Sequence, residues 1–185
     1  MEVNLELKLK TISKDGIPEA ISKVELYRYL NEPEEAESIC HDILAADPDN
    51  QLALRLLGLT LTDQFEGRHS DRYAETEKIF QSLRDPYDQL YYRGLLLERR
   101  AKAQMKAGVR AQILVGSLHE AMRCFEEAEK IHPPQNDDAV LRWNRCVRLL
   151  EKLGHAPVEE KHPGFHDDDT APVEIMRRPG GRTAK

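Results

Sequence analysis

The sequence predicts an all-α fold, and three observations support this prediction. Apolar residues recur at intervals of three and four over residues 18–150, which is the spacing of one face of a helix. Prolines, glycines and capping residues divide that span into segments of helical length. One of these segments also recurs later in the chain, which is typical of helical units that stack on one another.

Seven helices are expected, and local signals mark where several of them begin. Asn31 precedes a proline and is expected to cap the second helix. The pair Asp85-Pro86 opens the fifth helix, and Ser117 followed by Glu120 forms a capping box that opens the sixth. Asn136 caps the seventh. In chain order, the expected helices cover about residues 17–27, 33–46, 52–61, 73–83, 86–107, 117–131 and 137–153.

The ends of the chain differ from this helical region. Residues 1–16 form an N-terminal arm, in which alternating apolar residues between positions 3 and 9 suit either a strand or a frayed helical extension. Residues 155–185 contain several prolines and glycines and too few apolar residues to offset the entropy of ordering, so a disordered tail is expected. The helical domain is therefore expected over residues 17–154.

Composition narrows the class of protein. The 185 residues carry a formal net charge of −6, which suits one soluble domain and a tail. The N-terminus lacks the basic start and apolar run of a secretory signal, and no segment approaches the length of a membrane span. Three widely spaced cysteines, Cys40, Cys124 and Cys146, argue against a disulfide framework. We expect a cytoplasmic protein without a membrane role.

An internal repeat links two distant segments. Residues 35–48 (EAESICHDILAADP) align with residues 120–133 (EAMRCFEEAEKIHP), so that Ala36 falls on Ala121 and Cys40 on Phe125. The offset is constant, since 121 − 36 = 85 and 133 − 48 = 85. Generic amphipathicity fixes only an apolar stripe, so this agreement indicates two copies of one packing unit.

These residues resemble the tetratricopeptide repeat family, whose unit is a pair of antiparallel helices. The second-helix pattern is that of the two aligned segments. The first-helix pattern appears at Leu54, Leu57, Gly58 and Leu61, at Leu90, Gly94 and Leu97, and, without the glycine, at Ala20, Val24 and Tyr27. The resemblance covers residues 17–153 and implies about three degenerate repeats, stacked as a short right-handed solenoid with a C-terminal capping helix.

The middle repeat departs from this pattern. Its second helix places Ala74 at the right distance from Pro86, but Lys78 then occupies the aromatic position. A shifted register, with Thr76, Ile79, Phe80 and Leu83 facing inward, restores the apolar stripe and shortens the turn. The third repeat is longer than the others, which indicates an insertion around residues 106–116.

Reactive residue types occur together at Cys40, His41 and Asp42, but a packing role is favoured. Neighbouring positions on a helix point in different directions, so the three side chains cannot converge on one atom. The alignment places Cys40 in a buried slot, where a thiol acts as a small apolar group. His162 and His166 lie close to three aspartates in the tail. A solvated acidic run is favoured there over a metal site. No catalytic constellation, metal site or cofactor is expected.

The expected function is protein–protein interaction, as an adaptor or assembly factor. The resemblance implies a groove lined by first helices, here by Glu25, Arg28, Arg55, Thr62, Tyr91, Leu95 and Glu98. A basic patch is favoured as a solvated face, with an acidic partner as the alternative, and comprises Arg99, Arg100, Lys102, Lys106 and Arg110. Residue types found as anchors at interfaces occur on the terminal helix, namely Arg142, Trp143, Arg145 and Arg148. A tryptophan that covers the core, flanked by solvated arginines, is the favoured alternative.

Other readings remain open. The basic stretch 93–110 could contact nucleic acid, although aromatic residues that stack on bases are sparse there. A chaperone for an apolar or secreted client is a further alternative, and self-association stays open. The sequence does not name the partner.

Overall fold

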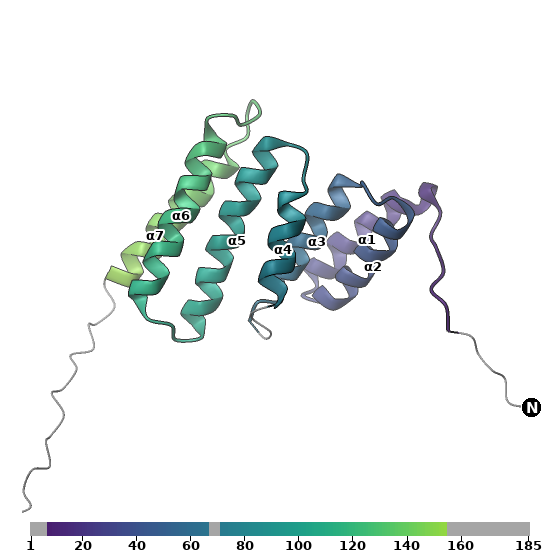
Figure 1. Ribbon diagram of the computed structural model, residues 1–185, viewed down its shortest axis with the longest axis horizontal. Helices are drawn as coiled ribbons and strands as arrows, with labels where there is room; N and C mark the ends of the chain where they lie inside the picture. Colours follow the sequence, from purple (N-terminus) through teal and green to yellow (C-terminus); the bar gives the residue numbers. More distant parts are fainter. Residues whose placement is uncertain (1–6, 67–70, 155–185) are drawn as a thin grey trace, which may run out of the picture. The chain divides into compact units, whose positions relative to one another are not determined.

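The computed structural model describes residues 7–66 and 71–154, and within them it is all-α. The described residues form seven α-helices, preceded by one 3-10 turn (Figure 1). The turn is η1 (Lys14–Gly16), and the helices are α1 (Ile17–Tyr29), α2 (Pro33–Ala46), α3 (Gln51–Asp63), α4 (Asp71–Gln81), α5 (Pro86–Lys106), α6 (Ala111–Glu129) and α7 (Asp138–Gly154).

The helices pack in the order of the sequence. Each helix contacts the next one along the chain, and the odd-numbered helices also contact one another in the order α1, α3, α5, α7. Buried clusters follow this arrangement, with one among α1, α2 and α3, one at the junction of α3, α4 and α5, and one among α5, α6 and α7. No helix among the described residues is both long and apolar enough to cross a membrane.

Two glycines allow the two helices within a pair to approach closely, one in the pair α3–α4 and one in the pair α5–α6. A Cβ atom at Gly58 would lie 2.2 Å from the ring of Phe80, and one at Gly94 would lie 2.7 Å from the ring of Phe125. In the first pair, the corresponding positions hold Val24 and Cys40, both fully buried. A larger residue on one helix is thus accompanied by a smaller one on the other, which keeps interior packing dense.

The register of α4 is the shifted one. Thr76, Phe80 and Leu83 are buried, whereas Ala74 and Lys78 are exposed. The Thr76 hydroxyl donates to the carbonyl of Arg72 at 2.6 Å, which satisfies a polar group inside the pair. Packing of Phe80 over Gly58 therefore sets the register of this helix.

Two helix starts differ from the predictions. α6 begins at Ala111, not at Ser117, because Leu114 and Leu118 are both fully buried and extend the inward stripe by one turn. Residues 111–116, within the expected insertion, are accordingly helical. Asn31 does not cap α2; it has φ of +61° after α1, a left-handed conformation that asparagine tolerates better than most residues.

Other boundaries agree with the predictions. Asp85 and Asn136 each accept a hydrogen bond at the start of the following helix, as expected, and Asn50 does the same for α3 without having been predicted as a cap. Gly108, with φ of +78°, follows α5. Residues 7–13 are neither helix nor strand, and Leu7 and Leu9 are exposed. Residues 1–6 of the arm and the tail 155–185, with His162 and His166, lie outside the described residues.

Candidate binding cleft

A polar cleft lies where the odd-numbered helices meet, near the C-terminal ends of α1, α3 and α5. Its volume is about 350 Å³. All its residues belong to α1, α3, α5 and α7 or to the residues that directly follow α1 and α3. The lining consists of Arg28, Asn31, Thr62, Asp63, Phe65, Glu66, Arg99, Lys102, Ala103, Lys106 and Arg142.

Asp63 connects three of these helices. Its carboxylate accepts a hydrogen bond from Nε of Arg28 on α1 at 2.9 Å and a further one from Arg99 on α5. Arg99 also donates to the hydroxyl of Thr62 at 2.6 Å, and that hydroxyl donates to the carbonyl of Leu59 at 2.6 Å. Charge-assisted bonds of this kind hold both guanidinium groups in place along one wall of the cleft.

Lys102 is the cation of the cleft without an ion-pair partner among the described residues. Lys106 pairs with Glu66, whereas Lys102 makes no ion pair with any residue that the structure describes. Burial lowers the pKa of Lys102; the charge of Glu98 opposes this, and Arg145, Arg99 and Arg142 lower the pKa further. An anion beside Lys102 would relieve this crowding of positive charge.

Glu98 lies beneath the cleft and is fully buried. One carboxylate oxygen, Oε1, is 3.5 Å from Nη1 of Arg142, and neither oxygen accepts a hydrogen bond from a described residue. Burial lowers the pKa of Arg142, but its hydrogen bond with Tyr91 and the charge of Glu98 outweigh this, so the pKa is raised above its ordinary value. The Arg142 side chain is therefore a fixed positive charge at the α7 side of the cleft.

The cleft carries an excess of positive charge. Arg28, Arg99, Lys102, Lys106 and Arg142 face two carboxylates in the lining, with a third, that of Glu98, beneath it. A concave surface with one dominant sign of charge concentrates ligands of the opposite sign. The arrangement is therefore suited to an anionic group.

The structure separates the residues that the sequence grouped as a groove. Arg28 and Thr62 line the cleft. Tyr91 is hydrogen-bonded to Arg142, which lines the cleft. Leu95 is a core residue, with 2 % of its surface exposed. Glu25 is exposed on α1 outside the lining, and Arg55 pairs with Asp88 at 3.5 Å near the beginnings of α3 and α5.

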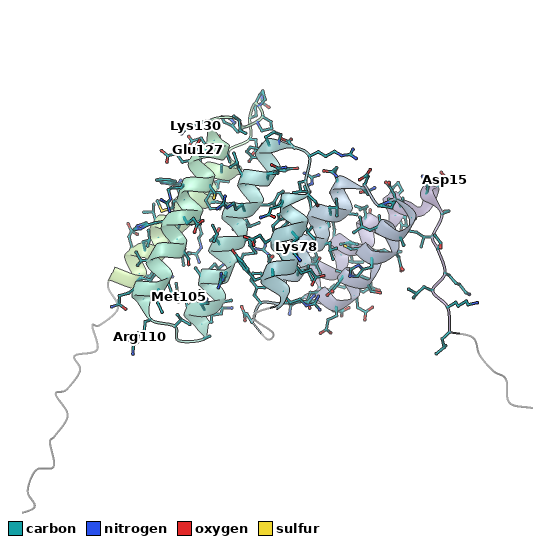
Figure 2. The ribbon with its side chains drawn as sticks, in the orientation of Figure 1. Asp15, Lys78, Met105, Arg110, Glu127 and Lys130 are labelled. Carbon is teal, nitrogen blue, oxygen red and sulfur yellow. The ribbon has the colours of Figure 1, made fainter. Side chains whose placement is uncertain are left out.

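The basic patch is divided in the same way. Arg99, Lys102 and Lys106 line the cleft, whereas Arg100 lies 4.3 Å from the centre of the Tyr73 ring. Arg110 is the residue before α6, at the same end of the helices as Met105 (Figure 2), and does not line the cleft.

On the terminal helix, Arg142 alone of the four expected anchors lines the cleft. Trp143 packs against the α5–α7 core, Arg145 is half-buried and Arg148 is exposed.

The sequence did not identify the acidic residues of the cleft. Asp63 and Glu66 lie in the polar stretch between the helices expected at 52–61 and 73–83, and their partners are 35 or more residues away. An acidic residue at the C-terminal end of a helix is unfavourable, because the helix dipole is negative there. Asp63 ends α3, and this unfavourable position is the signal that could have indicated a cationic partner elsewhere in the chain.

The reactive residue types at positions 40–42 do not form a site. Cys40 is fully buried, and burial raises its pKa to about 12. His41 is exposed, 3.8 Å from Glu37 on its own helix. Across the described residues, no three side chains of His, Cys, Asp or Glu are placed to hold a metal ion.

The chain matches no model of a known protein family, no curated protein and no solved structure.

Proposed function

We propose that this protein is an interaction module, an adaptor or assembly factor, that binds an acidic segment of a partner protein in the cleft. The observation that carries the proposal is the excess of positive charge in a concavity built from the odd-numbered helices and the residues that follow α1 and α3. Lys102 supplies a cation that makes no ion pair with a described residue. An extended or helical segment bearing carboxylates would complement this surface.

The helix pairs further support a tetratricopeptide-like arrangement, stacked as a short right-handed solenoid. The close approach of Gly58 to Phe80 and of Gly94 to Phe125 uses the same two positions in successive pairs. In such an arrangement the first helices of the pairs form one surface, which agrees with a cleft made by α1, α3, α5 and α7.

Nucleic acid is a weaker candidate for this surface. Arg99 and Lys106 are engaged by Asp63 and Glu66, and these two carboxylates would repel a phosphate backbone. Side chains of an acidic peptide can be placed singly between the carboxylates, whereas a nucleic acid presents a regular row of charges. The proposal therefore favours a protein partner over nucleic acid. It assigns no catalytic activity to the chain itself.

The test compares two charge reversals. Fluorescence anisotropy would measure the affinity of labelled peptides rich in aspartate and glutamate for the full chain and for Lys102→Glu. We expect the reversal to weaken binding by about tenfold or more, since it replaces an attraction with a repulsion. Lys78→Glu on α4 (Figure 2) is the matched control, because Lys78 is exposed and does not line the cleft. Equal effects of the two reversals would overturn the proposal.

A further inference from the structure

A second concavity adjoins the cleft and has a different character. It lies between the residues after α3, the start of α4 and the C-terminal half of α5, with a volume of about 320 Å³. Its walls are largely apolar. The residues that line it include Phe65, Tyr73, Arg100, Ala103, Ala107 and Val109. We call this concavity the hollow.

The cleft and the hollow share a wall. Phe65 and Ala103 line both of them. Along α5, Lys102 and Lys106 lie on the cleft side, while Ala103 and Ala107, one turn apart, line the hollow. A ligand that crosses Ala103 therefore passes directly from a basic surface to an apolar one.

Arg100 does not make the hollow a second anion site. Its guanidinium group lies 4.3 Å from the centre of the Tyr73 ring, an arrangement that holds the cation against the aromatic face. The Phe65 ring, with 4 % of its surface exposed, forms the common wall, and the small side chains of Ala103 and Ala107 leave the space open. The hollow thus offers an apolar surface to a side chain that enters it.

We propose that the partner segment carries an apolar side chain close to its acidic residues, and that this side chain occupies the hollow while the acids bind in the cleft. The inference rests on the proposed function and specifies its ligand. The positive charge of the cleft requires acidic residues in the segment. Because the cleft and the hollow share the wall of Phe65 and Ala103, the apolar residue must be close to the acidic residues in sequence. Burial of the apolar side chain would add affinity and set the register of the segment.

The experiment uses the full chain and short fluorescent peptides of defined sequence. Each peptide contains two aspartates and one leucine, with the leucine placed one, two, three or four positions after the aspartates. Two reference peptides replace the leucine with serine or both aspartates with asparagine. For the spacing that binds best, we expect the leucine-to-serine change to weaken binding about tenfold or more.

Two protein variants separate the two concavities. Ala107→Phe fills the hollow from an exposed position at the end of α5 and should weaken binding of the leucine peptide to the level of the serine peptide. Ala45→Phe, at an exposed position of α2 outside both concavities, is the matched control and should change neither affinity. Circular dichroism of both variants would verify that the helices are intact.

The outcomes distinguish this inference from the proposed function. If the serine and leucine peptides bind equally and only Lys102→Glu reduces binding, the hollow plays no part and the acidic-peptide function stands. If neither peptide binds, or if Lys102→Glu has no effect, both proposals are overturned. Loss of binding on leucine-to-serine exchange together with the effect of Ala107→Phe, but not of Ala45→Phe, supports the inference.

Discussion

At the scale of single residues, two of the helical glycines determine how closely the helices pack. Gly58 and Gly94 lie in helix interiors, where glycine costs about 0.5–1 kcal/mol relative to alanine. The rings of Phe80 and Phe125 occupy the volume that a methyl group would need. The cost of each glycine is therefore offset by the burial of a large aromatic side chain directly above it.

Gly58→Ala is expected to destabilise the protein by about 1–3 kcal/mol, because a Cβ atom 2.2 Å from the Phe80 ring forces the ring or the helix to move. Gly116→Ala is the matched control: it lies within α6 with nothing near the added atom and should stabilise by about 0.5–1 kcal/mol. Urea unfolding would measure both. Adding Phe80→Leu to Gly58→Ala should recover part of the loss, and strictly additive effects would contradict the contact.

The three cysteines are expected to resist alkylation in the folded protein. Burial raises the pKa of Cys40 and of Cys146 to about 12 and also raises that of Cys124, so the reactive thiolate is scarce at neutral pH. Iodoacetamide at about pH 8 should modify them only after unfolding in guanidinium chloride, as intact-mass measurement would show. Rapid modification of Cys40 in native buffer would mean that α1 and α2 open readily.

Sequence reasoning succeeded for residues whose role is local or repeated. The alignment of Cys40 with Phe125 predicted a buried thiol, and the first-helix pattern put Gly58 and Gly94 at the same position, where each packs against a phenylalanine ring. It failed for Asp63, because the two arginines that bind it are 35 and 36 residues away and no periodic pattern connects them. Long-range polar contacts of this kind depend on the stacking of the odd-numbered helices.

At the scale of helices, burial overrides local capping signals. The sequence around Ser117 has the form of a capping box, yet Ser117 lies inside α6. Leu114 is fully buried one turn before Leu118, so the free energy of burying another leucine favours an earlier start. The helix consequently begins after Arg110, whose side chain makes no capping hydrogen bond.

This earlier start predicts a stabilising substitution at Arg110. Arg110→Asp would supply a side-chain acceptor and a negative charge at the beginning of α6, with an expected gain of about 1 kcal/mol. Ser117→Ala is the informative comparison: a true cap would lose about 1 kcal/mol, whereas an interior serine should lose nothing or gain slightly. Thermal unfolding of both variants tests the boundary. A clear loss with Ser117→Ala would place the start of the helix at Ser117.

At the scale of the whole helical domain, charge is distributed to leave one cation unpaired. Asp63 pairs with both Arg28 and Arg99, and Glu66 pairs with Lys106, while Lys102 has no such partner among the described residues. Arg142 and Glu98 form a pair at 3.5 Å between α7 and α5. The domain thus retains a positive site where four helices converge, although its formal net charge as a full chain is −6.

The unpaired lysine predicts that ligand binding is linked to protonation. The pKa of Lys102 is lowered below 10.5 in the folded protein, so between the two values the unfolded chain holds more protons and stability rises with pH. A bound carboxylate would raise this pKa again. Binding of an aspartate-rich peptide should therefore take up protons at alkaline pH, where part of Lys102 has lost its proton, and weaken as pH rises through the lowered pKa.

Calorimetry in two buffers of different ionisation enthalpy measures this proton uptake directly. Lys102→Arg is the matched variant, because arginine keeps its charge at this pH. It should bind the peptide with similar affinity and show a smaller difference in heat between the buffers than the natural chain does. Identical buffer dependence in the two proteins would mean that Lys102 does not meet the peptide, and the anion would then have to be bound by Arg28, Arg99 or Arg142.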